Sequence, residues 1–402
     1  MWRRGNIVAK RLTKREKQKL NKLAIKNWRA VTAIILLLAI VLTVAYFMGW
    51  LDKCFKEEEP TLSTAGGYST TVDELRDMKV TFLDVGQGDC IVIQLPDGKN
   101  MIIDSGKYNS CQDVISDFTE ANDIDTFDYL LLTHQDDDHS GNMNWVIDNY
   151  KIKYIFRPNN YSGHKDSSIL PEEFNPDVDG YDSNTKTYSE FMISAYNEKC
   201  TVEIFNKDSD FTNEIKFGNN KYSYTFNFWT PTASRMDIEY SDPNNYSPIM
   251  TLEYGDKKIM FTGDAELENI SEYLESYGSS NNVDVLKVGH HGSENATTSE
   301  FLTAIDPEFA VIQCGINNSY GHPHAEVINR LQAHDSGIEI FRNDANGDIT
   351  LSFGVDDEIT NQSFDLENGD CSNNYLSGAQ IASQSLNLNY IEYLNNRSMF
   401  VA

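Results

Sequence analysis

Short apolar runs alternate with polar turns from residue 78 onward, and this pattern predicts many β-strands. Strand-like runs lie at 80–85, 90–95, 100–104, 129–132, 153–156, 222–229, 248–254, 258–262, 283–288 and 309–313. Apolar positions at helical spacing predict helices at 143–149, 188–197, 267–275, 299–304 and 325–332. Many strands with helices inserted late in each half predict an α+β fold, in which two packed sheets are covered by helices on both outer faces.

The longest apolar run lies near the N-terminus, at residues 30–51, and it contains no charged side chain. As a helix, these 22 residues span about 33 Å, the thickness of a bilayer core. Trp28 and Trp50 lie at its two edges, and residues 1–29 hold 11 Lys and Arg against one Glu. Because basic flanks stay inside the cell, the pattern predicts a single-pass membrane anchor with a cytoplasmic N-terminus and an extracellular bulk.

Three other interpretations of this segment fit its sequence less well. A cleaved signal peptide has a shorter basic region and a small-residue cleavage site, whereas this run ends in Phe47-Met48-Gly49-Trp50. A lipoprotein site at Cys54 is disfavoured because Lys53 precedes the cysteine. A buried core helix is rarely so long and so uniformly apolar. The anchor is therefore the preferred prediction.

The positive and negative charges are unevenly distributed along the chain. The basic arm carries +10 and the whole chain −28, so the remainder carries −38. This excess argues against attachment to nucleic acid through the overall field, although local contacts remain open. With 40% hydrophobic and 11% aromatic residues, the composition excludes a disordered chain. We expect a solvated linker at 52–77, one folded domain at 78–355 and a polar tail at 356–402, rich in Asn, Ser and Gln.

The six cysteines form no C-x-x-C pair, which excludes a zinc knuckle and a thioredoxin motif. Cys90 lies inside an apolar strand-like run and is predicted to be buried.

Candidate chemistry concentrates after the strand at 129–132. His134, Asp136, Asp138 and His139 lie within six residues, and such a crowd of carboxylates and imidazoles is stabilised by a divalent cation. The spacing allows His134 and Asp136 to bind one ion, and Asp138 and His139 another. The alternative is an acidic surface loop in which an Asp caps a helix.

Two further strand ends carry the same residue types. Asp264 follows the strand at 258–262 and is placed to bridge two metals, and the pair His290-His291 follows the strand at 283–288. Singly these are ordinary loop residues, but together the three strand ends predict a binuclear metal site at one edge of the sandwich.

Several motifs in order along residues 78–353 resemble the metallo-β-lactamase superfamily, and more narrowly the hydrolase domain of ComEC-type DNA-uptake proteins. They are Phe82-Leu83-Asp84-Val85-Gly86-Gln87-Gly88-Asp89, Ile103-Asp104-Ser105-Gly106, His134-x-Asp136-x-Asp138-His139, Gly263-Asp264, Leu286-Lys287-Val288-Gly289-His290-His291-Gly292-Ser293 and Tyr320-Gly321-His322-Pro323-His324. The resemblance implies a four-layer αββα sandwich with two metal ions at the sheet edges.

The resemblance also implies roles for individual residues. The metal-ligand motifs fall on His134, Asp136, Asp138, His139, Asp264 and His290, or its neighbour His291. Asp104 falls on a carboxylate that supports a ligand from behind, and Asn245 and Ser247 lie in a segment similar to one that precedes the Gly-Asp strand in ComEC-type members. Asp136 stands where the broader family has a second His, and no third histidine motif precedes Gly263. This oxygen-rich set suits Mn²⁺ as well as Zn²⁺.

A two-metal site supports hydrolysis, and a phosphodiester suits it best. We expect Asp138 to orient the nucleophile, His291, Ser293 or His322 to contact the phosphoryl group or the leaving oxygen, and Asn245 and Ser247 to contribute to substrate binding. The preferred hypothesis is a membrane-anchored extracellular phosphodiesterase acting on nucleic acid. The alternatives are hydrolysis of a cell-wall phosphodiester of the phosphocholine or teichoic-acid type, and a non-catalytic surface scaffold. Asp136 argues against a true β-lactamase.

Overall fold

The computed structural model describes residues 68–108, 111–158, 186–205, 207–232, 234, 242–278, 281–354 and 359–361. The chain divides into two compact units, Met1–Leu62 and Ser63–Ala402, and all the described residues belong to the second. The predicted basic arm and membrane anchor lie outside the described residues and stay predictions. Within the described ranges, no helix combines the length and the apolar character that a membrane span requires.

The described strands form two sheets, A and B. Sheet A has the order β1 (Tyr68–Thr71), β8 (Ser209–Phe217), β9 (Asn220–Trp229), β10 (Ile249–Tyr254), β11 (Lys257–Phe261), β12 (Val285–Lys287), β13 (Phe309–Ile312) and β14 (Glu339–Arg342). Sheet B has the order β16 (Ile359–Asn361), β15 (Ile349–Phe353), β2 (Met78–Phe82), β3 (Ile91–Gln94), β4 (Asn100–Ile103), β5 (Thr126–Leu131), β6 (Lys151–Pro158) and β7 (Thr201–Phe205).

Each sheet has an antiparallel part and a parallel part. In sheet A, β11 to β14 are parallel, and in sheet B, β4 to β7 are parallel. Residues of β12 are all buried, as expected for a strand covered on both faces. In β9, by contrast, buried and partly exposed positions alternate, because one face points to the other sheet and the other face points outward.

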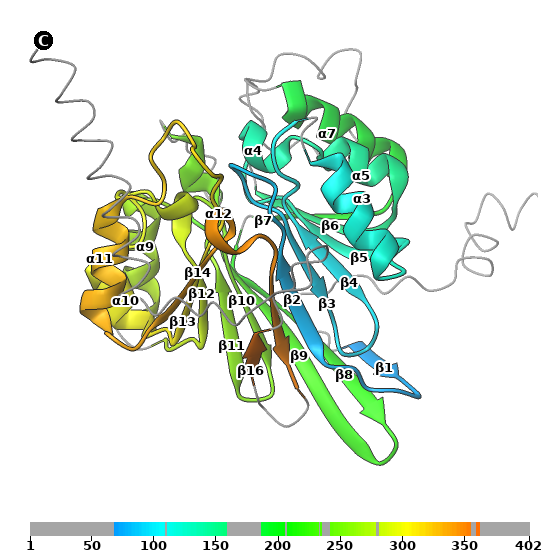
Figure 1. The fold of residues 1–402 in the computed structure, drawn as a ribbon. Coiled ribbons are helices and arrows are strands. Elements are labelled where there is room, and N and C mark those ends of the chain that lie inside the picture. Colours follow the sequence, from blue (N-terminus) through cyan, green and yellow to red (C-terminus); the bar gives the residue numbers. More distant parts are fainter. Residues whose placement is uncertain are drawn as a thin grey trace, which may run out of the picture. The chain divides into compact units, whose positions relative to one another are not determined.

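Helices cover the outer face of each sheet (Figure 1). The helices α3 (Gln112–Ala121), α5 (Met143–Asn149) and α7 (Lys186–Glu198) pack on sheet B, and α9 (Leu267–Tyr277), α10 (Ser299–Ile305) and α11 (Ala325–His334) pack on sheet A. The short helices α4 (Asp137–Ser140) and α12 (Asn343–Asn346) follow β5 and β14. Buried residues such as Val146 and Phe191 fill the first helix layer, and Ile270 and Leu331 fill the second.

A third core lies between the two sheets and is largely aromatic. Ring centroids are 5.5 Å apart for Tyr129 and Phe226, and 5.1 Å apart for Phe156 and Phe228. Burying such a side chain stabilises the fold by roughly 1.5–3 kcal/mol. Two sheets packed face to face between two helix layers confirm the predicted αββα sandwich.

The sheets extend beyond the predicted domain limits. β1 lies in the predicted linker and pairs with β8 in parallel, and β16 lies in the predicted tail and pairs with β15. The limits at 78 and 355 are thus too narrow for the sheets. Both strands are short, and pairing with a long neighbour supplies the backbone hydrogen bonds that their own sequences do not indicate.

Candidate metal centre

The candidate site lies where the parallel strands of both sheets end. Asp104 follows β4, and the loop that begins at Thr133 follows β5. In the other sheet, Asp264 follows β11 and the pair His290-His291 follows β12. Because parallel neighbours end at the same edge of a sheet, each half of the chain brings two polar loops together. The two edges face each other, so residues from both halves come into contact.

Three ligand atoms form a nearly equilateral triangle at this edge. His139 Nε2 lies 3.2 Å from Asp264 Oδ2 and 3.3 Å from His291 Nε2, and His291 Nε2 lies 3.3 Å from Asp264 Oδ2. Asp138 Oδ2 lies 3.4 Å from His291 Nε2. A tetrahedral ion about 2.0 Å from each ligand separates the ligand atoms by about 3.3 Å. The spacing therefore fits one divalent ion held by these four side chains.

A looser group of ligand atoms adjoins the triangle. His134 Nε2 lies 3.8 Å from Asp136 Oδ2, and His290 Nε2 lies 3.7 Å from Asp264 Oδ2. His134 Nε2 and Asp264 Oδ1 are buried without a hydrogen-bond partner among the described residues. Buried polar atoms are normally paired, so these two are suited to contact a cation. Asp264 touches both groups, as its predicted bridging position requires.

Each imidazole in the site has its Nδ1 engaged, which leaves its Nε2 for a ligand. His139 Nδ1 donates to Asp104 Oδ2 at 2.7 Å, and His290 Nδ1 donates to Glu266 Oε1 at 2.7 Å. His291 Nδ1 donates to the carbonyl oxygen of Gln313 at 3.0 Å. Such partners fix the tautomer and the orientation of a metal-binding imidazole.

Asp104 is itself held rigidly behind the site. Its Oδ1 accepts a 2.8 Å hydrogen bond from the backbone N of Thr133, and its Oδ2 accepts a 2.6 Å bond from Thr133 Oγ1. The side chain is fully buried. It therefore lies behind His139, where the resemblance implied a supporting carboxylate.

Burial and neighbouring charges shift the pKa values of three groups at the site. Burial acts to raise the pKa of Asp264, but the imidazoles of His139, His291 and His290 outweigh it and hold this pKa well below the usual range. Burial, together with His139, lowers the pKa of His134 to about 4, so its imidazole is neutral at pH 7. Burial raises the pKa of Asp136 to about 6. The site thus presents an ionised bridging carboxylate beside a neutral imidazole.

Three site residues adopt the left-handed backbone region. The φ angles are 56° for Asp104, 45° for His290 and 53° for His291. Non-glycine residues reach this region at a cost of about 1–3 kcal/mol each, and such strain concentrates at functional sites. The strained backbone at these three residues therefore indicates that the placement of their side chains serves a function and not local stability.

The structure revises the predicted roles of the histidine pair. His291 is 1% exposed and its Nε2 is part of the triangle, so of the two predicted roles its position favours that of a ligand. The side chain of His290 is 23% exposed and belongs to the looser group. A spacing argument cannot separate adjacent histidines, because the backbone turn at both residues decides which imidazole enters the core.

Three of the predicted substrate-binding residues make hydrogen bonds within the protein. Asn245 is buried, and its Oδ1 accepts a 3.4 Å hydrogen bond from the backbone N of Asn269 in α9. Ser247 is fully buried, and its Oγ accepts a 3.3 Å bond from the backbone N of Asp264. Ser293 Oγ accepts from the backbone N of Asn295 at 3.4 Å. These contacts hold loops of the site, and substrate contact by the three residues stays a prediction.

His322 is the remaining predicted substrate-binding residue, and it lies beside the metal ligands. Its ring centroid is 5.4 Å from that of His290 and 6.2 Å from that of His291. Gln87 Nε2 donates to His322 Nδ1 at 3.4 Å, which leaves the proton on Nε2. Burial, with the neighbouring His291 and His290, lowers its pKa to about 3.

Two buried charged residues at the site were not predicted. Asp89, His139, Asp264 and His291 each offer a ligand atom within 4.8 Å of the others, and Lys287 pairs with Asp89. Both Asp89 and Lys287 stand inside motifs noted in the sequence, but spacing alone gave them no role.

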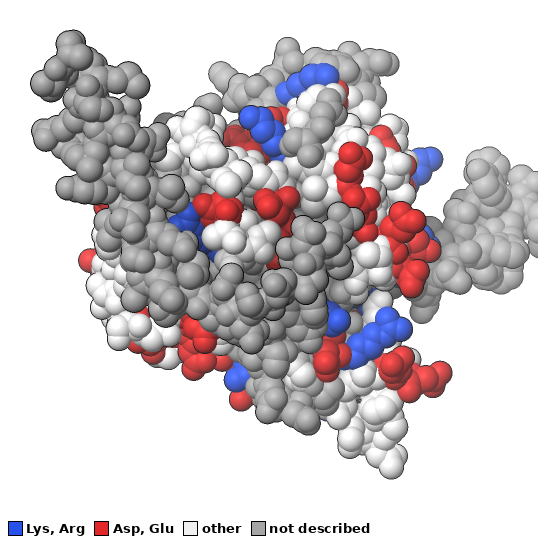
Figure 2. All heavy atoms as spheres, viewed as in Figure 1, with Lys and Arg blue, Asp and Glu red and all other residues white. Residues whose placement is uncertain are grey.

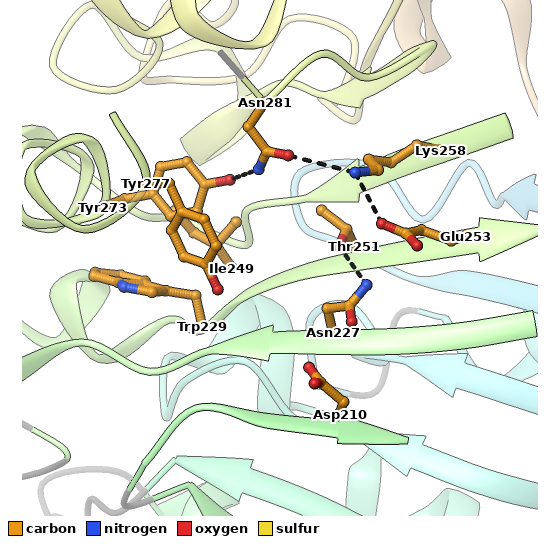
Figure 3. A pocket seen from close by; sticks show the side chains of 10 residues that line it. All are labelled: Asp210, Asn227, Trp229, Ile249, Thr251, Glu253, Lys258, Tyr273, Tyr277 and Asn281. Atoms are coloured by element: carbon orange, nitrogen blue, oxygen red, sulfur yellow. Dashed lines mark hydrogen bonds and ion pairs between the residues drawn. The ribbon is translucent and has the colours of Figure 1, made fainter. Parts of the chain in front are cut away.

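A separate cavity of about 300 Å³ lies on the outer face of sheet A (Figure 3). It is lined by Trp229, Tyr273 and Tyr277 on one side and by polar strand residues, among them Asn227 and Thr251, on the other. None of the metal-site residues lines it.

The chain is similar in sequence to known proteins. Residues 83–185 and 237–316 match the family described as the metallo-beta-lactamase superfamily. The chain is 29% identical over 292 residues to ComE operon protein 3 of Bacillus subtilis, covering 68% of this chain and 33% of that protein. It is 27% identical over 278 residues to competence protein ComA of Neisseria gonorrhoeae, covering 69% and 32%.

A solved structure, that of the metallo-beta-lactamase fold protein YhfI from Bacillus subtilis, covers 66% of this chain and 95% of its own, with 12% identity and a TM-score of 0.37. In sequence, the chain is thus similar to the metallo-beta-lactamase superfamily. Within that superfamily it is similar to competence proteins of the ComEC type, and it spans about a third of the length of the curated relatives it matches.

Proposed function

We propose that this chain is a metal-dependent phosphodiesterase that acts outside the cell on nucleic acid and is anchored to the membrane by residues 30–51. The single observation that carries the metal-dependent activity is the triangle formed by His139 Nε2, His291 Nε2 and Asp264 Oδ2, whose sides measure 3.2–3.3 Å. The similarity to competence proteins supports the choice of nucleic acid.

The two groups of ligand atoms would hold two divalent ions, Zn²⁺ or Mn²⁺. His139, His291, Asp138 and Asp264 form the tighter set. His134, Asp136 and His290 form the looser set, and Asp264 is shared. Bound ions would supply Lewis acidity, which lowers the pKa of water and offsets charge on a phosphoryl oxygen.

The chain's own residues account for positioning and proton handling. Within the tighter set, the Asp138 side chain is 27% exposed while that of Asp264 is 3% exposed, so Asp138 is the carboxylate of this set that reaches solvent. It is therefore placed to accept a hydrogen bond from an attacking water. His322, with Nδ1 engaged by Gln87, presents Nε2–H as a donor to a phosphoryl or leaving oxygen.

The acidic surface makes bound cations important for an anionic substrate. On the face drawn in Figure 2, outside the grey residues, Lys and Arg stand singly among Asp and Glu and form no continuous basic band. Repulsion would therefore oppose binding of nucleic acid except where metal ions offset it locally. We expect cleavage to be weak at low divalent-ion concentration and to stop in EDTA.

The test compares the purified full chain, reconstituted with Mn²⁺ or Zn²⁺, on DNA and on bis-p-nitrophenyl phosphate. Asp138→Ala should lower turnover by about 100-fold or more. Asp137→Ala is the matched control, because Asp137 is adjacent but contributes no atom to either ligand group, and it should retain activity. Turnover of the small ester without cleavage of DNA would favour the cell-wall substrate. Full activity in EDTA would refute metal dependence, and less than one ion per chain without turnover would favour a scaffold.

A further inference from the structure

Lys287 is a buried cation inside an otherwise anionic and imidazole-rich site. It is the last residue of β12 and is 1% exposed. Its Nζ pairs with Asp89 Oδ2, donates to the carbonyl oxygen of Gly263 at 3.1 Å and lies 3.9 Å from Asp264 Oδ1. A buried lysine is unfavourable unless it is paired, so these contacts are what keep it there.

Asp89 lies behind the ligand imidazoles and not among their ligand atoms. Its Oδ1 is 3.2 Å from His291 Nδ1, and its Oδ2 is 3.9 Å from His139 Nδ1. The Nε2 atoms that form the triangle are on the other side of both rings. Asp89 is one of the four residues that offer ligand atoms within 4.8 Å of one another, but it contacts His291 from the Nδ1 side. This contact is electrostatic and not a hydrogen bond, because the Nδ1–H is donated to the Gln313 carbonyl oxygen.

We propose that Asp89 and Lys287 form a positioning pair for the metal ligands, an inference that rests on the proposed metal-dependent function. Asp89 aligns the His291 ring from the Nδ1 side, together with the Gln313 carbonyl oxygen. Lys287 neutralises Asp89 and fixes the Gly263 carbonyl oxygen, and thereby the backbone that carries Asp264.

The pair also joins the two halves of the chain. Asp89 precedes β3 of sheet B, and Lys287 ends β12 of sheet A. The backbone N of Asp89 donates to the Asp138 carbonyl oxygen at 3.2 Å. The loop that carries Asp89 therefore also contacts the segment that carries the ligand-group residue Asp138. Positioning residues behind metal ligands typically affect metal affinity by 10–100-fold. The same range is expected here, because the pair contacts the segments that carry His291, Asp264 and Asp138.

The experiment measures metal binding by the full chain, by titration calorimetry with Zn²⁺ and by the visible spectrum of the Co²⁺ form. Asp89→Asn keeps the shape of the side chain and removes its charge, and it should weaken Zn²⁺ binding 10–100-fold and shift the Co²⁺ bands. The matched control is Asp128→Asn. Asp128 lies on β5, and its Oδ1 forms a part-buried ion pair with Lys153 Nζ at 2.6 Å, which the substitution removes. This control should leave both readouts unchanged.

A second variant separates positioning from simple stability. Lys287→Met should weaken Zn²⁺ binding to a similar degree, and the double variant with Asp89→Asn should be no weaker than the weaker single variant, because the two act as a unit. Thermal unfolding of the metal-free proteins reports stability independently. If either single variant loses stability yet binds Zn²⁺ with wild-type affinity and an unchanged Co²⁺ spectrum, the pair is only structural and the inference is wrong. Failure of the wild type to bind metal would instead contradict the proposed function.

Discussion

His139 Nδ1 donates a 2.7 Å hydrogen bond to Asp104 Oδ2, joining the loops that follow β5 and β4. The contact places the proton on Nδ1 and directs Nε2 toward Asp264, 3.2 Å away. Asp104 itself has a left-handed backbone (φ 56°), so the position needs a residue that tolerates this region and carries an acceptor.

Replacement of Asp104 by Asn should weaken divalent-metal binding by about 10–100-fold. Asn tolerates the left-handed backbone and keeps a side-chain oxygen, but it does not supply the charge that favours the Nδ1–H tautomer. Calorimetric titration with Zn²⁺ measures the change. Asp125→Asn, in the loop before β5, is the control and should bind as the wild type does. Equal affinity in the two variants would contradict the supporting role of Asp104.

Replacement of Gly88 by Ala should destabilise the domain by about 2 kcal/mol or more. An added Cβ would lie 2.4 Å from the Asp138 carbonyl oxygen, and the φ angle of +142° is itself unfavourable for Ala. Gly98→Ala is the control, since Gly98 also has a positive φ (+82°) but its Cβ would meet no atom within 4 Å. The free energies of unfolding of both variants are measured in urea, and the difference between their losses gives the cost of the steric contact with Asp138. Equal losses would show that the contact with Asp138 is unimportant.

Replacement of Asp348 by Asn should flatten the pH dependence of stability. The backbone N of Asp84 donates to Asp348 Oδ1 at 2.7 Å, and an Asn side chain keeps that acceptor. Burial raises the pKa of Asp348, and burial, with Asp348 and Asp344 nearby, raises that of Asp84. A carboxyl group with a raised pKa in the folded state stabilises it at low pH and loses that contribution as pH rises through the folded-state pKa.

The variant should therefore lose less stability than the wild type between about pH 4 and pH 7. The free energy of unfolding, measured in urea at several pH values, checks this. A steeper loss in the variant would show that the charge of Asp348 stabilises the fold.

Two buried thiols should resist alkylation in the folded protein. Cys90 and Cys314 are fully buried, and burial raises the pKa of Cys314 to about 12 and that of Cys90 well above its usual range. At pH 8 the thiolate fraction of Cys314 is on the order of 10⁻⁴. Iodoacetamide followed by mass spectrometry should label the half-buried Cys200 first, and Cys90 and Cys314 only after denaturation. Early labelling of Cys314 would contradict this packing.

Much of the fold could be predicted because its central elements have strong patterns. The helix at 143–149 was predicted with the bounds of α5, and the strands at 222–229 and 309–313 correspond to β9 and β13 within two residues. Elements that depend on partners were missed. β7 and β14 are short edge strands, and α3 is an acid-rich helix whose buried face includes Ile115. Their stability comes from tertiary packing, which local sequence does not record.

The candidate site was predictable in its residue types but not in its contacts. Asp and His residues after strand ends predicted a metal site at the edge of the sheets, and Asp138, Asp264 and His291 do converge there. The choice between His290 and His291 depends on the two-residue backbone turn, and the support from Asp89 depends on how one sheet meets the other. Spacing within one loop carries no information on either.

His139 and His291, whose Nε2 atoms form one side of the triangle, are separated by 152 positions along the chain. An ion shared by these two side chains would act as a reversible cross-link that closes a loop of this length. For a permanent link around a loop of about 100 residues, the chain-entropy estimate is about 4.7 kcal/mol. The domain should therefore gain or lose rigidity with the supply of divalent ions, and the seam between its two sheets is where unfolding should begin when that supply falls.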